Sequence, residues 1–162
     1  MSLAFLVAVA VAAGLQPAEP APAERDSGWH NAQLLHLLQL SPADGWRRTA
    51  TGLYYRRVGG DGTGPRPTVE DNVTIHYAGR FIDGTEFDSS IARGEPATFP
   101  LGRLIRGWQE GVPLMSVGDR FEFAIPWQLG YGAAGRGPIP GGATLLFTVE
   151  LIAIAPRPSS DP

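Results

Sequence analysis

The stretch from Gly84 to Trp108, GTEFDSSIARGEPATFPLGRLIRGW, constrains the fold of this chain more than any other. It places an aromatic–carboxylate pair, Phe87 and Asp88, ahead of an apolar run around Phe99. The glycines and prolines between them bend the backbone and prevent a long helix. Such a pattern is typical of the wall and floor of an apolar pocket that carries one polar group at its rim.

The composition favours one globular domain that is rich in turns. The 162 residues are 43% hydrophobic and 18% charged, with 21 glycines and 15 prolines, so we expect few long helices. A net charge of −3, with no basic cluster larger than a pair of arginines, argues against a nucleic-acid partner. The chain has no cysteine, which excludes disulfides, a thiolate nucleophile and a sulfur metal site.

Alternating polar and apolar residues predict an antiparallel sheet. The segment 53–58 is β-prone, 73–77 and 120–125 alternate, and 144–154 is expected to form a long final strand. Asp83-Gly84 lies between two strand-like runs and predicts a tight hairpin.

The only helix expected in the middle of the chain is short. Ile105, Trp108 and Val112 share one helical face, but Gly107 and Gly111 weaken the helix. We therefore expect an α+β fold, in which a curved antiparallel β-sheet wraps around one short α-helix.

Residues 1–15 are predicted to be a signal peptide. Leu3 to Leu15 is an uncharged apolar run, shorter than the roughly 20 residues that span a bilayer, and Ala10 to Ala12 fits a cleavage site. No positive charge precedes Leu3, so an uncleaved anchor or a disordered N-terminus stays open. We expect an exported protein, periplasmic or secreted, without a stable membrane span.

The segment 16–44 is expected to join this leader to the domain. It begins as a proline- and alanine-rich linker and continues as a leucine-rich helix over 29–40. A helix of about three turns is marginal alone, so it must dock on the domain or on a second copy. We favour docking on the domain and a monomer. The domain is placed at 45–155, followed by a flexible tail at 156–162.

Other chemistries find little support in the residues. Gly130 to Gly135 matches the G-x-G-x-x-G pattern of dinucleotide sites, but the segment 136–142 that follows cannot form the required helix. The three histidines are scattered, and no nucleophile elbow occurs. We therefore expect no metal and no cofactor.

Three motifs follow one another in the chain: VTIHYAGRFIDGTEFDSS, FPLGRLIRGWQEGVPLMSVGDRFEFAIP and GYGAAGRGPIPGGATLLFTVEL. In this order and spacing they resemble the FKBP-type peptidyl-prolyl cis-trans isomerases, in particular the bacterial exported subgroup. The resemblance runs from about Gly45 to Ile154. It implies the FKBP-like fold, a five- or six-stranded antiparallel sheet curled around one short helix.

The resemblance also implies site residues. Trp108 would form the floor under a substrate proline ring, Asp88 would be the polar group at the rim, and Tyr131 would offer its hydroxyl to the substrate carbonyl. These three are the expected catalytic residues, although a purely structural role for Asp88 stays open. The expected substrate-binding residues are Tyr77, Phe87, Phe99, Leu104, Ile105, Ile139 and Phe147.

The implied function is to accelerate rotation about X-Pro bonds during the folding of exported proteins. Its partners would be proline-containing peptides and unfolded or folding proteins, with macrolide inhibitors as a further class of ligand. Two departures bear on how tightly such inhibitors would fit: Ala97 replaces a wall aromatic of many family members, and 102–108 is about two residues shorter than in small cytosolic members. The alternative is a non-catalytic chaperone or proline-segment binding module that uses the same pocket.

Overall fold

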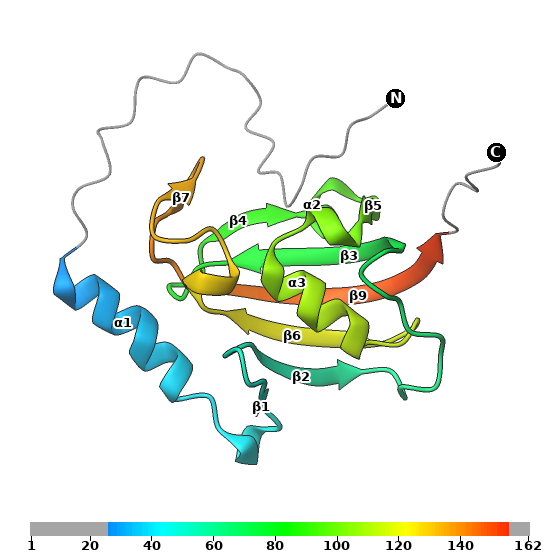
Figure 1. Cartoon of the computed structure of the whole chain (residues 1–162), viewed down its shortest axis with the longest axis horizontal. Helices are drawn as coiled ribbons and strands as arrows, with labels where there is room; N and C mark the ends of the chain where they lie inside the picture. Colours follow the sequence, from blue (N-terminus) through cyan, green and yellow to red (C-terminus); the bar gives the residue numbers. More distant parts are fainter. Residues whose placement is uncertain (1–25, 156–162) are drawn as a thin grey trace.

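The structure, a computed structural model, describes residues 26–155 and is dominated by one antiparallel sheet (Figure 1). Its strand order is β1-β2-β6-β9-β3-β4, and β5 also pairs with β3. The strands are β1 (Arg47–Arg48), β2 (Tyr54–Gly59), β3 (Asn72–Arg80), β4 (Glu86–Ser89), β5 (Ala97–Pro100), β6 (Arg120–Ile125) and β9 (Leu145–Ala155). A separate ribbon pairs β7 (Gly135–Arg136) with β8 (Ile139–Pro140).

The helices are short apart from the first. The α-helices are α1 (Ser27–Leu38), α2 (Ser90–Arg93) and α3 (Arg106–Gly111), and the 3₁₀ turns are η1 (Pro42–Asp44), η2 (Leu101–Arg103), η3 (Val112–Leu114) and η4 (Trp127–Leu129). Helix α3 crosses one face of the sheet (Figure 1). The predicted α+β architecture is confirmed.

The sheet has seven strands rather than five or six. Helix α2 separates two strands, β4 and β5, that both pair with β3, and Arg47–Arg48 adds the short strand β1. The predicted hairpin joins β3 to β4: the Phe81 N–H donates to the Thr85 carbonyl, and Gly84 turns the chain with φ 87°. Only glycine adopts this conformation without strain.

The core lies between the sheet and α3. Alternate residues of each central strand face it, as the alternation predicted; on β3 these are Val73, Ile75 and Tyr77, all buried. Two glycines let α3 approach closely, because a Cβ on Gly107 would lie 2.7 Å from Ile125, and one on Gly111 2.6 Å from Phe123. The glycines that weaken this helix are therefore required by its contact with the sheet.

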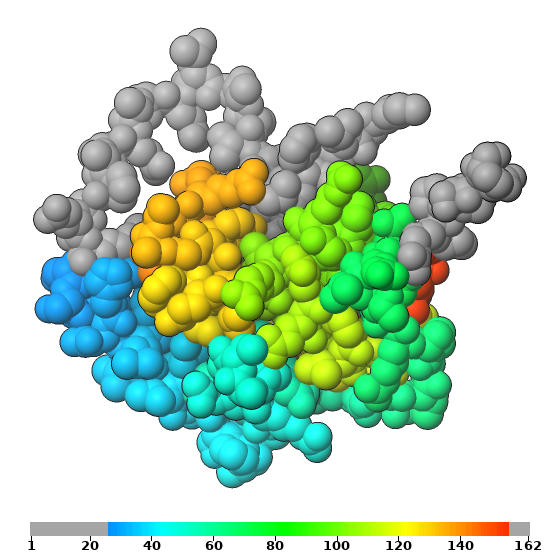
Figure 2. Space-filling model, in the orientation of Figure 1, coloured from blue at the N-terminus to red at the C-terminus, as the bar shows by residue number. Residues whose placement is uncertain are grey.

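Helix α1 docks on the domain by one face only. Gln33 and Leu37 are buried, and the Gln33 side-chain oxygen accepts a 2.8 Å bond from the Thr144 N–H. The predicted docking is confirmed, but Leu34, Leu35 and Leu38 stay more than half exposed. In the space-filling view the blue segment that contains α1 lies along the flank of the domain (Figure 2).

The predicted leader at 1–15, most of the proline-rich linker and the tail at 156–162 lie outside the described residues. Within 26–155, none of the helices has the length and apolar character that crossing a bilayer requires.

Candidate functional site

Trp108 is the centre of a cluster of aromatic rings between α3 and the sheet. The indole is fully buried, and three rings meet it edge-on: Tyr77 at 5.3 Å between centroids, Phe99 at 6.5 Å and Phe147 at 5.1 Å. Phe87 extends the cluster toward solvent through its contact with Phe147 at 5.6 Å. We call these five residues the aromatic cluster. Edge-to-face contacts of this kind add stability beyond area burial.

The Trp108 indole N–H has no hydrogen-bond partner among the described residues although it is buried. A buried donor without a partner costs about 1–3 kcal/mol. Departures from local stability rules are expected at functional sites. The unpaired N–H therefore makes Trp108 a candidate functional residue.

Space for the aromatic cluster comes from Gly79 in β3. A Cβ at this position would lie 2.6 Å from the Phe147 ring and 2.7 Å from the Phe87 ring. Neither ring could keep its place beside any other residue type. Gly79 thus positions two of the predicted substrate-binding side chains.

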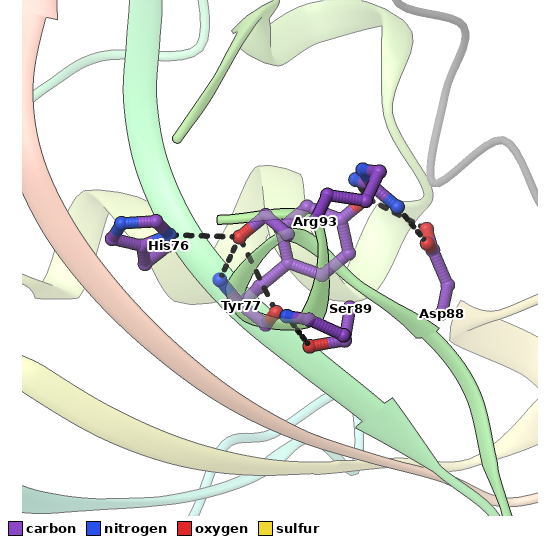
Figure 3. Close-up of polar contacts among 7 residues, drawn as sticks. His76, Tyr77, Asp88, Ser89 and Arg93 are labelled. Carbon is purple, nitrogen blue, oxygen red and sulfur yellow. Dashed lines mark hydrogen bonds and ion pairs between the residues drawn. The ribbon is translucent and has the colours of Figure 1, made fainter. Parts of the chain in front are cut away.

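A closed triangle of hydrogen bonds borders the aromatic cluster. The Tyr77 hydroxyl donates to Asp88 at 2.6 Å, and Arg93 donates to the other Asp88 oxygen at 2.5 Å and to the Tyr77 oxygen at 2.9 Å. Figure 3 shows the Arg93 guanidinium turned toward the Asp88 carboxylate. Burial, and next the bond with Asp88, raises the pKa of Tyr77, so its hydroxyl stays protonated and donates.

Ser90 fixes the triangle to the sheet. Its hydroxyl accepts from the Tyr77 N–H at 2.8 Å and bonds His76 Nδ1 at 3.1 Å. Ser89 caps helix α2 by accepting from the Ala92 N–H at 3.1 Å. These bonds hold α2, and with it Arg93, against β3.

Tyr131 follows η4 and is half-buried. Burial raises its pKa to about 12, with a smaller lowering by Arg136 and a raising by Asp88. The hydroxyl therefore stays protonated at neutral pH and lies within the electrostatic reach of Asp88. The structure thus brings the three expected catalytic residues, Trp108, Asp88 and Tyr131, into one region.

The remaining predicted site residues differ in exposure. Ile105 is half-buried at the start of α3, whereas Leu104 is buried. Ile139 is also buried, only 2% exposed, and belongs to the hydrophobic core. Ala97 is half-buried and contacts the same core.

The family of the chain follows from comparisons with known proteins. A family model described as FKBP-type peptidyl-prolyl cis-trans isomerase matches residues 64–152, which include all five residues of the aromatic cluster. The chain belongs to the FKBP-type isomerase family.

Among curated FKBP-type relatives, FkpA of Aeromonas hydrophila is 52% identical over 126 residues, which cover 78% of this chain and 46% of that protein. The FKBP-type 22 kDa isomerase of Escherichia coli is 46% identical over 120 residues, which cover 74% of this chain and 58% of that protein. The chain thus spans about half the length of the curated relatives it matches.

Solved FKBP-type structures have the same fold. The crystal structure of FkpA from Escherichia coli matches with a TM-score of 0.76 and 38% identity, over 79% of this chain and 60% of that one. An isomerase from Pseudomonas syringae matches with a TM-score of 0.74 and 30% identity, over 83% of this chain and 99% of that one. The expected FKBP-like fold is confirmed.

Two residues of the candidate site were missed by the sequence analysis. Arg93 follows Asp88 by five positions, and only the adjacent Gly94, which ends α2 with φ 79°, indicated that the arginine closes a helical turn. Phe81 contacts Phe87 at 4.8 Å between centroids. Its position before the hairpin turn gave no sign of this contact.

No cluster of three or more potential metal-ligating side chains occurs within the part of the chain that the structure describes. His76 forms a hydrogen bond with Ser90 through Nδ1.

Proposed function

We propose that this chain is a peptidyl-prolyl cis-trans isomerase that acts through the aromatic cluster. The observation that supports this most directly is the buried indole of Trp108, which has three rings edge-on around it and an unpaired N–H. A proline ring is apolar and rigid, so it fits a wall of aromatic side chains. The proposed substrates are proline-containing segments of unfolded or folding proteins.

The reaction that such a surface must accelerate is rotation about one bond, the C–N bond that joins a residue to the following proline. The barrier to X-Pro rotation is about 18–20 kcal/mol, because amide resonance opposes twisting, and the uncatalysed reaction takes tens to hundreds of seconds. The twisted state has lost that resonance, so its amide is less dipolar than the planar form. An apolar surface disfavours the planar, water-preferring amide and thus lowers the barrier.

Each polar group then has a distinct role. The Tyr131 hydroxyl, kept protonated by its raised pKa of about 12, donates to the substrate carbonyl and orients it. Asp88 has both oxygens engaged, one by Tyr77 and one by Arg93, so we assign it a positioning role that holds the Tyr77 ring beside Trp108. No proton transfer is needed, because no covalent bond is made or broken.

We further propose that the protein works outside the cytoplasm on exported clients. The support is the apolar run from Leu3 to Leu15 with its small-residue end. Fractionation of cells that express the tagged full chain tests this: cytoplasmic retention of the uncleaved protein would refute it.

The activity is tested by the cis-to-trans rate of a prolyl tetrapeptide. We compare the parent protein with Tyr131→Phe and Trp108→Phe, which keep the aromatic rings, and with Tyr54→Phe, which lies outside the aromatic cluster. Tyr131→Phe should lower kcat/KM by roughly threefold to tenfold, the effect of losing a hydrogen bond worth about 0.5–1.5 kcal/mol. Trp108→Phe should also lower it, and Tyr54→Phe should match the parent.

A non-catalytic binding module is the second candidate, and specific observations favour it. Three leucines of α1 and Trp127 are exposed, and a cavity of about 500 Å³ lies between α1 and the domain, where apolar segments of an unfolded chain could bind. The tetrapeptide assay separates the two candidates. A folded parent protein without any acceleration would leave binding as the function.

A further inference from the structure

A second cavity, at the edge of the sheet, has a strong charge bias. It has a volume of about 360 Å³, and every charged residue that lines it is an arginine: Arg47, Arg56, Arg57 and Arg66. No acidic side chain among the described residues lines it, and it shares no residue with the aromatic cluster. We call this cavity the arginine pocket.

Two of the four arginines are neutralised from outside the pocket. Arg56 is paired with Glu122 at 2.6 Å, and Arg57 lies 3.6 Å from the buried Asp119. Each of these positive charges is therefore balanced by a carboxylate that does not line the arginine pocket.

Arg47 and Arg66 differ, because neither side chain makes a hydrogen bond or an ion pair with any residue in 26–155. Both side chains are exposed. They lie on segments far apart in the sequence, yet they line the same cavity. The arginine pocket therefore carries two positive charges that nothing in the described chain compensates.

The wall of the arginine pocket is apolar. The rings of Tyr55 and Phe121 lie parallel, with an interplanar angle of 5° and 6.2 Å between centroids, and the Arg57 guanidinium lies 5.7 Å from the centre of the Phe121 ring. A ligand that fits must bring an apolar part for this wall and anionic groups for the two free guanidinium groups. A small inorganic anion would use only the second feature.

The arginine pocket also lies beside a free strand edge. Strand β1 pairs with Tyr54 and Tyr55 only, whereas β2 continues to Gly59 as the outer strand of the described sheet (Figure 1). Unpaired main-chain groups on such an edge accept an extended peptide as an added strand. An extended polypeptide with acidic and apolar side chains can thus bind the strand edge, the apolar wall and the free guanidinium groups together.

We propose that the arginine pocket binds acidic, extended polypeptide segments, with carboxylates on Arg47 and Arg66 and apolar side chains against Tyr55 and Phe121. Guanidinium groups match carboxylates because both are planar and can form two parallel hydrogen bonds. The arginine pocket would thus bind a segment of the client protein that contains no proline. This inference does not depend on isomerase activity.

The test uses the full chain and a fluorescein-labelled octapeptide of alternating glutamate and leucine. Binding is followed by fluorescence anisotropy at low salt and again at higher salt. The charge-reversal variant R47E/R66E should bind roughly fivefold to tenfold more weakly, because two favourable ion pairs become repulsive. The matched control R103E/R106E makes the same change in net charge at exposed arginines outside the pocket and should bind like the parent.

Four further results decide the proposal. The tetrapeptide isomerisation rate should be the same in R47E/R66E and the parent, which separates this site from the aromatic cluster. Equal weakening in R103E/R106E would show that the effect comes from net charge alone and would overturn the proposal. The proposal would also be overturned if a lysine–leucine octapeptide bound as tightly as the glutamate–leucine peptide. It would be overturned, too, if inorganic phosphate released the peptide more effectively than sodium chloride at the same ionic strength.

Discussion

At the scale of single residues, the site depends on how a buried carboxylate is hydrogen-bonded. The Asp88 side chain is only 5% exposed, and a buried carboxylate without partners is costly. Tyr77 and Arg93 each give it a hydrogen bond, so the charge is balanced and the Tyr77 ring is fixed in place. The sequence indicated Tyr77 and Asp88 as site residues. It did not indicate Arg93, because no local pattern determines in which direction the short helix α2 places this side chain.

Arg93→Ala should lower the free energy of unfolding by about 1–3 kcal/mol, because it removes the charged partner of Asp88. This is less than for a fully buried pair, since the Arg93 side chain is 44% exposed and water screens it. Urea unfolding measures the change. The control Arg80→Ala breaks the exposed pair with Glu86 and should cost less than about 1 kcal/mol; equal costs would refute the structural role of the triangle.

The raised pKa of Tyr131 predicts a loss of stability in alkali. Its ordinary pKa is about 10, and burial raises the pKa to about 12 in the folded state. Between these values the unfolded chain has released a proton that the folded chain keeps, so stability falls as pH rises. Below pH 10 the contribution is fully present.

Urea midpoints at pH 8 and pH 11 measure this effect. The parent protein should lose more stability over that interval than Tyr131→Phe, which has no hydroxyl to titrate. A drop of equal size in both proteins would show that Tyr131 is not the group responsible.

At the scale of elements, α3 shows why helix propensity and packing disagree. The sequence predicted a short helix weakened by Gly107 and Gly111, and the structure gives the reason for both glycines: the helix lies so close to β6 that a Cβ would overlap Ile125 or Phe123. Strand alternation predicted which faces are buried, since that property is local. The closeness of α3 to the sheet was not predictable, because it depends on residues in β6.

Gly107→Ala should destabilise the protein by about 1–3 kcal/mol through overpacking against Ile125, although alanine favours helix by about 1 kcal/mol. The control Gly28→Ala, in α1, would bring its Cβ only to the Asp26 side chain at 3.2 Å and should change stability little. Thermal unfolding of both variants checks the comparison. A Gly107→Ala protein as stable as the parent would mean that α3 can move away from the sheet.

At the scale of the whole molecule, the described chain consists of one sheet domain with α1 attached to its flank. The predicted fold class and the location of the site between sheet and helix follow from patterns along the whole sequence. The partial docking of α1 does not follow from such patterns, because its leucines surround much of the helix. Only the structure shows which of them contacts the domain. The domain limits at 45 and 155 stay a prediction.

Removal of α1 tests whether the sheet domain folds alone. A fragment of residues 41–162 should fold and keep the tetrapeptide rate of the full chain, since α1 contributes no residue to the aromatic cluster. Its stability should fall by about 1–3 kcal/mol, because the fragment loses the burial of Leu37 and the hydrogen bond between Gln33 and the Thr144 N–H. Circular dichroism and urea unfolding measure both properties, and a fragment that does not fold would place α1 inside the folding unit.

The burial of Trp108 also makes this residue an internal fluorescence probe. The chain has four tryptophans; Trp108 is fully buried, while Trp29, Trp46 and Trp127 are at least partly exposed. A soluble quencher such as acrylamide would therefore suppress the emission of the other three first. The light that remains comes from the indole in the aromatic cluster, so binding of the proposed proline-containing substrate there can be measured as a change in its intensity, without a label on either partner.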